Sequence, residues 1–224
     1  PWFTQGIYYG SWFHYPYEPS KIDNIEKYDY IFISHLHEDH CDIRFLKKYL
    51  KDNSETKIII AERPNNYLSK ILDRNKIEYL AIKSTNIGES FIDIIVDDSR
   101  GNSSIDSILV LRKKSNIYIN ANDCIVSEDI ANKINKLKEN NIDYKVLLSI
   151  GYAGANDWPH MYLNYYGNDL LIAASKKRKL NINKFIKGVN YINPSIIHPF
   201  AGQYILGGHL YKYNSQRGIP DPIV

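Results

Sequence analysis

The stretch His35-Leu36-His37-Glu38-Asp39-His40 directly follows a short apolar run, residues 28–34. The run is rich in aromatic and β-branched residues, which predicts a buried strand. Residues two apart in an extended segment point the same way, so His35 and His37 can share one metal ion. Asp39 and His40 must then turn and face another direction, which offers a second metal position beside the first.

Three imidazoles and a carboxylate so close together are either metal ligands or a polar surface turn. The whole chain has 7 histidines, and three of them stand at the end of this one predicted strand. Imidazole suits zinc, iron and manganese, and a carboxylate beside it suits an ion that also activates water. We therefore expect a divalent metal, zinc first and manganese or iron as alternatives, with one or two ions bound.

Two further candidate ligands follow other predicted strands. Asp123 comes just after the apolar run 117–120, where it could bridge two ions or could be an ordinary turn or helix-capping residue. His198 follows the short run 195–197, where it could be a ligand or a partly buried histidine with other partners. Because the chain also carries the histidine cluster, the interpretation of Asp123 and His198 as metal ligands is favoured.

The pattern along the chain predicts a layered α/β fold with mixed sheets. Strand-like runs alternate with helical patterns at both ends, while residues 78–120 contain strands only. We find no repeat or linker, so we expect one domain over residues 1–224. The predicted strands are 28–34, 57–61, 78–82, 91–96, 105–111, 117–120, 144–149 and 195–197, and the predicted helices are 43–50, 67–75, 127–137 and two between 169 and 191.

The first seventeen residues carry eight aromatic side chains and read as a loop. Such a loop needs a surface to pack upon, so we expect a strand upstream of Pro1. The loop either stacks on a ligand or covers the hydrophobic core.

Ser34 to His40 is similar to the signature S-H-x-H-x-D-H of the metallo-β-lactamase superfamily, and Asn122-Asp123-Cys124 resembles its bridging-aspartate turn. The resemblance implies an αββα sandwich of two mixed sheets flanked by helices, with its first strand upstream of Pro1 and a metal site at the sandwich edge. Weaker matches resemble a branch with the metallohydrolase part of CMP-sialic acid hydroxylases and, more distantly, N-acyl phosphatidylethanolamine phospholipase D. These matches are Pro1-Trp2, residues 151–155, Pro159-His160 and residues 199–204.

One expected ligand is missing from the sequence. The superfamily usually supplies another histidine before the bridging aspartate, but this chain has no histidine between Cys41 and Pro159. The site of His35 and His37 is therefore one ligand short, while Asp39, His40, Asp123 and His198 reach the usual number for zinc. Asp106 could substitute with an oxygen ligand, or it could be a polar residue at the start of a strand.

We expect hydrolysis by a metal-bound hydroxide, because a divalent ion lowers the pKa of bound water to about 7. Asp39 would orient the water, and the leaving group would take a proton from His160 or His209. His160 lies after the glycine-containing segment 151–154, where loops gather over a site. His209 follows Gly207-Gly208 and could equally face solvent.

The composition limits the choice of partners. With 28 Lys+Arg against 25 Asp+Glu, the net charge of +3 does not favour nucleic acid, and no apolar stretch is long enough to span a membrane. The run 176–179 could hold a phosphate-bearing ligand or RNA, or be a solvated helix end. Two cysteines, Cys41 and Cys124, favour a reducing, cytoplasmic setting. We expect a small-molecule substrate. The sequence is compatible with a homo-oligomer but does not decide the oligomeric state.

Three classes of function remain. The first is a metal-dependent hydrolase acting on a small-molecule ester, a phosphoester or a nucleotide- or carbohydrate-linked substrate. The second is a non-haem iron oxidoreductase that needs a separate electron-transfer partner, because Cys41 and Cys124 alone cannot build a Rieske centre. The third is a catalytically depleted binding protein.

Overall fold

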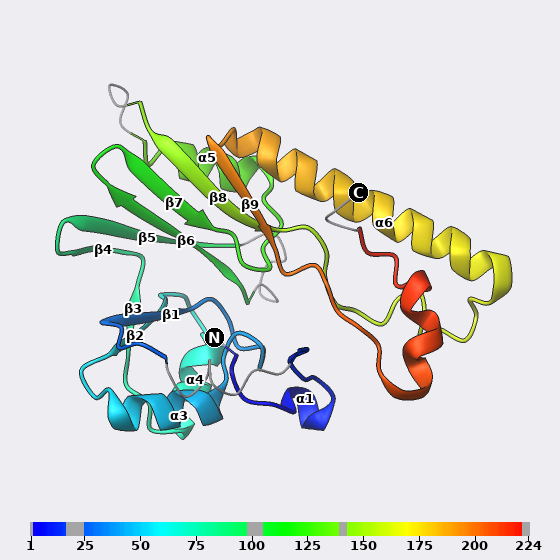
Figure 1. Ribbon diagram of the computed structural model, residues 1–224. Coiled ribbons are helices and arrows are strands. Elements are labelled where there is room, and N and C mark those ends of the chain that lie inside the picture. Colours follow the sequence, from blue (N-terminus) through cyan, green and yellow to red (C-terminus); the bar gives the residue numbers. More distant parts are fainter. Residues whose placement is uncertain (1, 17–24, 98–104, 139–142, 221–224) are drawn as a thin grey trace. The chain divides into compact units, whose positions relative to one another are not determined.

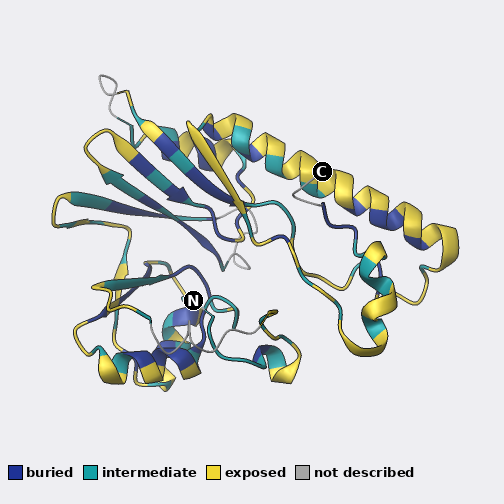
Figure 2. Cartoon of the chain, viewed as in Figure 1, coloured by how far each residue is buried: buried dark blue, intermediate teal, exposed yellow. Residues whose placement is uncertain are grey.

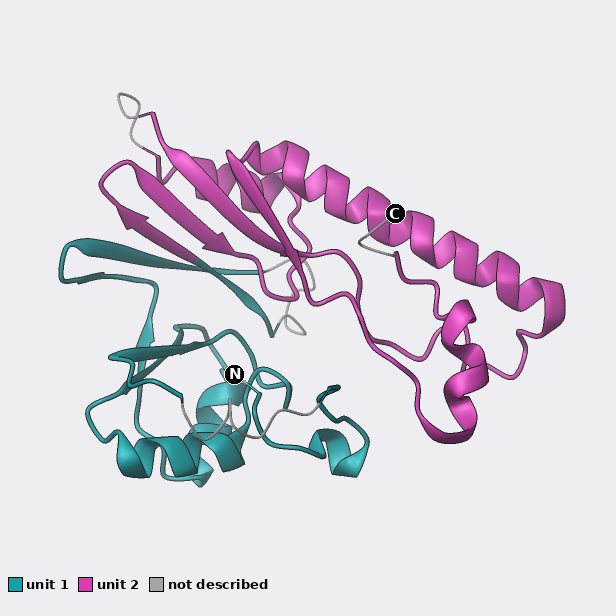
Figure 3. Ribbon diagram, viewed as in Figure 1, with its two compact units in different colours: residues 1–109 teal, residues 110–224 magenta. Residues whose placement is uncertain are grey.

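The computed structural model describes residues 2–16, 25–97, 105–138 and 143–220 (Figure 1). Its strands form two sheets, one of order β1-β2-β3 and one of order β4-β5-β6-β7-β8-β9. Helices accompany both sheets, so the layered α/β prediction is confirmed. The chain divides into two compact units, residues 1–109 and 110–224 (Figure 3). Pro1 and Tyr17, which belong to the predicted N-terminal loop, lie outside the described residues.

The first unit is built on a parallel sheet. Each crossover between its strands carries a helix, as parallel strands require. The unit contains α1 (Ile7–Gly10), β1 (Tyr30–Ile33), α3 (Ile43–Asp52), β2 (Lys57–Ala61), α4 (Tyr67–Arg74), β3 (Tyr79–Ile82), β4 (Ser84–Ile87) and β5 (Ser90–Val96). β1 pairs with β2 and β2 with β3, both parallel, while β4 and β5 form an antiparallel hairpin.

The core of this unit lies between the sheet and one face of α3 and α4 (Figure 2). Leu46 and Leu72 are fully buried at 0% exposure, as is Ile60 of the central strand. Each such side chain contributes about 1.5–3 kcal/mol by its removal from water. The core therefore fixes β1, the strand that leads into the histidine cluster.

The second unit contains a second run of parallel strands. Its elements are β7 (Asn116–Asn120), α5 (Glu128–Asn135), β8 (Lys145–Gly151), α6 (Gly167–Ile192), β9 (Ile196–Phe200) and the 3-10 helix η2 (Gly208–Gln216), while β6 (Ser107–Lys113) leads into it. β7 pairs with β8 and β8 with β9, both parallel. Among the described residues, no helix is both long and apolar enough to cross a membrane.

Two predictions for α6 are wrong. Residues 167–192 form one helix of 26 residues instead of two, because no proline interrupts the segment. Gly188 does not break the helix: a Cβ there would lie 2.8 Å from the Ile150 side chain, so glycine allows close packing on β8. The basic run 176–179 lies inside this helix and not at a helix end.

Candidate metal centre

The loop 34–41 is held between the end of β1 and the start of α3. The Cys41 amide donates to the His37 carbonyl at 2.7 Å, which closes a tight turn. Asp42 then caps α3 by accepting from the Phe45 amide at 3.0 Å. Its second oxygen accepts from the amides of Phe3 and Thr4 at 3.1 and 2.6 Å. One carboxylate therefore ties the loop, the helix and the N-terminal segment together.

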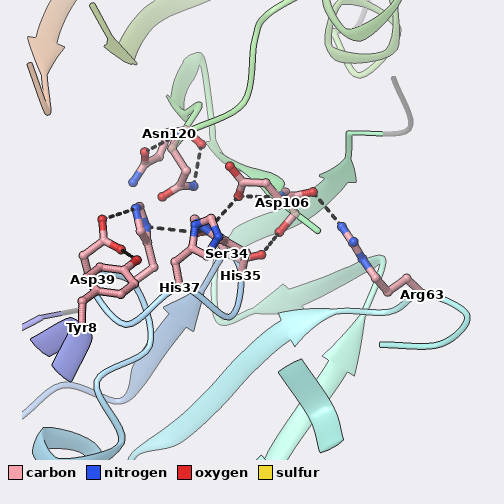
Figure 4. A network of polar contacts seen from close by, with 11 residues as sticks. Tyr8, Ser34, His35, His37, Asp39, Arg63, Asp106 and Asn120 are labelled. Carbon is pink, nitrogen blue, oxygen red and sulfur yellow. Dashed lines mark hydrogen bonds and ion pairs between the residues drawn. The ribbon is translucent and has the colours of Figure 1, made fainter. Parts of the chain in front are cut away.

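His35, His37 and Asp39 lie together in the first unit (Figure 4), and the His40 ring lies 4.2 Å from the His35 ring between centroids. His35 is buried, and its Nε2 lies 2.8 Å from Nδ1 of His37. Nε2 of His40 lies 3.5 Å from Oδ2 of Asp39. His35 and His37 belong to one group of side chains that could hold a metal ion, and Asp39 and His40 belong to another. The sequence-based division into two pairs therefore has a counterpart in the structure.

Asp106 lies behind His35, on the ring nitrogen that does not face His37. Its Oδ1 is 3.1 Å from Nδ1 of His35 and also accepts from the Ser107 amide at 2.7 Å. Because a carboxylate only accepts, Nδ1 of His35 is the donor in this contact. This carboxylate–histidine arrangement is the one that orients histidines in metal sites.

Asp106 is itself fixed by its surroundings. Arg63 donates to its backbone carbonyl at 2.7 Å, and the neighbouring Ser107 hydroxyl donates to the Ser34 carbonyl at 2.8 Å. Among the described residues, no group donates to the buried Oδ2 of Asp106. The side chain thus orients His35 with one oxygen.

Tyr8 is a site residue that the sequence did not reveal. Its hydroxyl donates to Oδ1 of Asp39 at 2.6 Å, and its amide donates to Glu38 at 2.6 Å. Burial, followed by the hydrogen bond and the charge of Asp39, raises the pKa of Tyr8, so the phenol stays protonated as a donor. Tyr8 and Tyr9 have φ of 51° and 58°, an αL turn that no local pattern predicted.

The aromatic N-terminal segment packs on the first unit. Phe3 contacts Phe45 of α3 at 4.5 Å between ring centroids, and Trp2 stacks on His14 at 4.1 Å. This packing favours the covering role over a free stacking platform for this part of the loop. The same packing holds the N-terminal segment next to the metal-binding loop, where the Tyr8 hydroxyl contacts Asp39.

Asp123 and His198 both belong to the parallel strands of the second unit, but in different ways. His198 was predicted to follow a strand of residues 195–197, whereas it lies exposed inside β9, which continues to Phe200. Asn120, Ser149 and His198 are in register across β7, β8 and β9, and the Ser149 hydroxyl lies 3.0 Å from Nδ1 of His198. Asp123 follows in the turn after β7, where Asn122 adopts φ of 50°. Ser127, not Asp123, caps α5. The alternative that Asp123 is a helix cap is therefore wrong.

The two predicted proton donors differ in environment. His160 is buried at 7% exposure in the loop after β8, and its Nδ1 has no hydrogen-bond partner among the described residues. Burial, reinforced by the positive charge of Lys177, lowers the pKa of His160. His209 is exposed in η2, as its alternative interpretation expected.

Comparison with known proteins finds one curated relative and a number of solved structures, of which two are described below. A putative Rieske 2Fe-2S iron-sulfur protein of Mycolicibacterium smegmatis is 25% identical over 237 residues, which cover 98% of this chain and 43% of the relative. This chain thus spans less than half of that relative's length. No family model matches the sequence.

The two structures share the fold. A mutant of CmlA beta-hydroxylase matches with a TM-score of 0.53 at 15% identity, over 80% of this chain and 38% of that one. A putative metal-dependent hydrolase from Parabacteroides distasonis matches with a TM-score of 0.50 at 19% identity, over 82% and 70%. The chain has a metallo-β-lactamase fold. The residues Ser34 to His40 lie in the loop between β1 and α3 of this fold.

Proposed function

We propose that this chain is a metal-dependent hydrolase of the metallo-β-lactamase superfamily. The observation that carries the proposal is the placement of Nε2 of His35 and Nδ1 of His37, 2.8 Å apart, with the opposite nitrogen of His35 held by Asp106. A carboxylate behind the ring is the usual partner that orients a histidine toward a metal ion. Zinc is the first candidate, with manganese or iron as alternatives.

His35 and His37 would hold one ion, and Asp39 and His40 would hold a second. We infer from the signature and the bridging-aspartate turn that Asp123 and His198 complete these positions. The place of Asp123 in the turn beyond the end of β7 supports its part of this set, because a side chain beyond a strand end is positioned by a rigid sheet.

A divalent ion at this centre would supply a Lewis acid that acidifies water at neutral pH and polarises the bond to be cleaved. The chain's own residues have defined tasks around it. The Tyr8 hydroxyl fixes the orientation of Asp39, so that its other oxygen stays beside His40. Asp39 can then orient the attacking water, and His160 or His209 remains the proposed proton donor to the leaving group.

For the substrate we propose a small-molecule ester, first a phosphoester or a nucleotide- or carbohydrate-linked compound. The branch resemblance supports this class. We also propose a cytoplasmic location, supported by Cys41 and Cys124, which are both buried and free of disulfides.

A second candidate function is oxidation by non-haem iron. It is favoured by the names of the relative, an iron-sulfur protein, and of one structural neighbour, a beta-hydroxylase. In this case the electrons would come from a separate iron–sulfur partner or domain. A binding protein that has lost its metal is the outcome if no ion is bound.

Metal analysis and an activity panel separate these functions. The chain, purified without added metal, is measured for zinc, manganese and iron, then assayed on phosphodiesters, phosphomonoesters, lactones and thioesters. We expect at least one equivalent of metal and hydrolysis that is lost in His37→Ala and Asp39→Ala. Asp73→Ala, an exposed carboxylate on α4, is the matched control and should keep full activity. Iron with oxygen consumption and no hydrolysis would select the oxidoreductase.

A further inference from the structure

Buried nitrogen donors gather in the second unit, outside the metal centre. They come from the loop after β8, from α6 and from the segment after η2. His160 Nδ1, Asn181 Nδ2 and Arg217 Nη1 are buried and have no hydrogen-bond partner among the described residues. An unsatisfied buried donor costs free energy, so several together call for an acceptor.

Lys177 adds a buried ammonium to this group. Its side chain is 3% exposed and its Nζ donates to the Trp158 carbonyl at 2.7 Å. An ammonium has three donors, and this is the one hydrogen bond that the described residues provide. Burial lowers the pKa of Lys177 to about 8, so the group is still mostly charged at pH 7.

Several contacts bring these side chains together. The Tyr204 ring lies 6.4 Å from the His160 ring and 5.2 Å from Cζ of Arg217. Gly218 packs so closely on α6 that a Cβ there would be 2.9 Å from Cβ of Lys177. Asn181 follows Lys177 by one helical turn on α6, so both occupy the same side of the helix. Figure 1 shows η2 beside α6.

The local charge is positive. The charges that act on His160 come from Lys177 and Arg217, both cationic, and from Asp157, an exposed carboxylate. Within the described residues, two cations therefore face a single anion. Buried cations without enough anionic partners are costly unless a bound anion neutralises them.

We propose that His160, Lys177 and Arg217 form an oxyanion-binding site, which takes the phosphate or carboxylate group of a ligand. Lys177 provides a compact charge, Arg217 a free guanidinium N–H, and His160 an N–H from its neutral ring. Tyr204 and the loop 152–166, which carries His160, lie outside helices and strands, so local opening of these segments can admit the ligand. In this site His160 is a hydrogen-bond donor to the bound oxyanion.

The site is tested by calorimetric titration of the metal-stripped and dialysed full chain with inorganic phosphate and, separately, with acetate. Because no metal is present, the result is independent of the proposed hydrolase activity. We expect saturable binding of one ion, with phosphate and acetate showing which oxyanion the site prefers. Lys177→Met and Arg217→Gln should weaken binding at least about tenfold, since each removes a charged hydrogen-bond donor.

Two controls keep the test decisive. Lys179→Met removes an exposed charge from the same helix and should leave the affinity unchanged. Asp157→Asn removes the competing carboxylate from an exposed position and should strengthen binding severalfold. If the buried variants do not fold, Asp157→Asn decides alone, and an unchanged affinity in that variant overturns the proposal. Absence of saturable binding of both ions to the parent also overturns it.

Discussion

Asp42 offers the sharpest test of how the metal-binding loop is held. Its carboxylate caps α3 and also accepts from the amides of Phe3 and Thr4. Removing a helix cap costs about 0.5–2 kcal/mol, and each hydrogen bond to a charged group is worth about 1.5–3 kcal/mol. Phe3 and Thr4 are half-buried, so water can replace part of their loss. We therefore expect Asp42→Ala to lower the free energy of unfolding by about 3 kcal/mol, and Asp42→Asn by about half of that.

The effect must depend on pH in a defined direction. Burial acts to raise the pKa of Asp42, but hydrogen bonds from Phe45, Thr4 and Phe3 outweigh it and hold the pKa below the ordinary value of 3.8. A carboxylate with a depressed folded-state pKa stabilises the fold above its unfolded-state pKa. This stabilisation is lost as the pH falls below 3.8 and through the folded-state value. The gap between parent and Asp42→Asn should therefore be full at pH 7 and narrow in acid.

Urea unfolding followed by circular dichroism at pH 7, 5 and 3.5 measures this gap. Asp52→Asn changes an exposed carboxylate at the other end of α3 and should alter stability by less than about 0.5 kcal/mol. A parent and Asp42→Ala of equal stability at pH 7 would refute the reasoning. So would a gap that widens in acid.

Four other predictions follow from the described contacts. Asp106→Asn should weaken metal binding about 10–100-fold in a competition titration with a chelating dye, because His35 loses its orienting carboxylate. An unchanged metal affinity in Asp106→Asn would show that the contact between Asp106 and His35 does not contribute to metal binding. Tyr8→Phe should lower the free energy of unfolding by about 1–2 kcal/mol through loss of its hydrogen bond to Asp39, measured by urea titration. Gly218→Ala should destabilise by at least about 1 kcal/mol in thermal melts, since φ is +67° and the new Cβ would lie 2.7 Å from a backbone oxygen. Finally, parent stability should rise relative to Lys177→Met between pH 8 and 10.5, where the unfolded lysine still binds a proton that the folded one has lost. A constant difference between those two pH values would contradict the lowered pKa.

The strands and helices were predicted well where the periodicity is strong. β2 lies at Lys57–Ala61, as the apolar run indicated, and α3 and α4 begin at the predicted residues. β4 was missed because Ser84–Ile87 carries polar residues and no alternating apolar pattern. Its pairing with β5 through the turn at Gly88 supplies the hydrogen bonds that make it a strand.

The metal-binding loop was also evident in the sequence, but its supporting residues were not. Tyr8 reaches Asp39 from thirty-one positions away, through an αL turn. Asp106 is far along the chain from His35. From the sequence it could be a substitute metal ligand or a polar residue at the start of a strand, and only its position behind the His35 ring shows its contact. Neither contact has a local signal, since both depend on which loops the core brings together.

The sequence by itself determined most of the strands and helices and the four signature side chains after β1, because these follow from local periodicity and from the spacing of ligand-type residues. Only the tertiary structure decided what surrounds those side chains. Hydrogen-bond partners such as Tyr8 and Asp106, and the gathering of His160, Lys177 and Arg217, are contacts between distant segments, and they are set by packing of the core rather than by any stretch of residues.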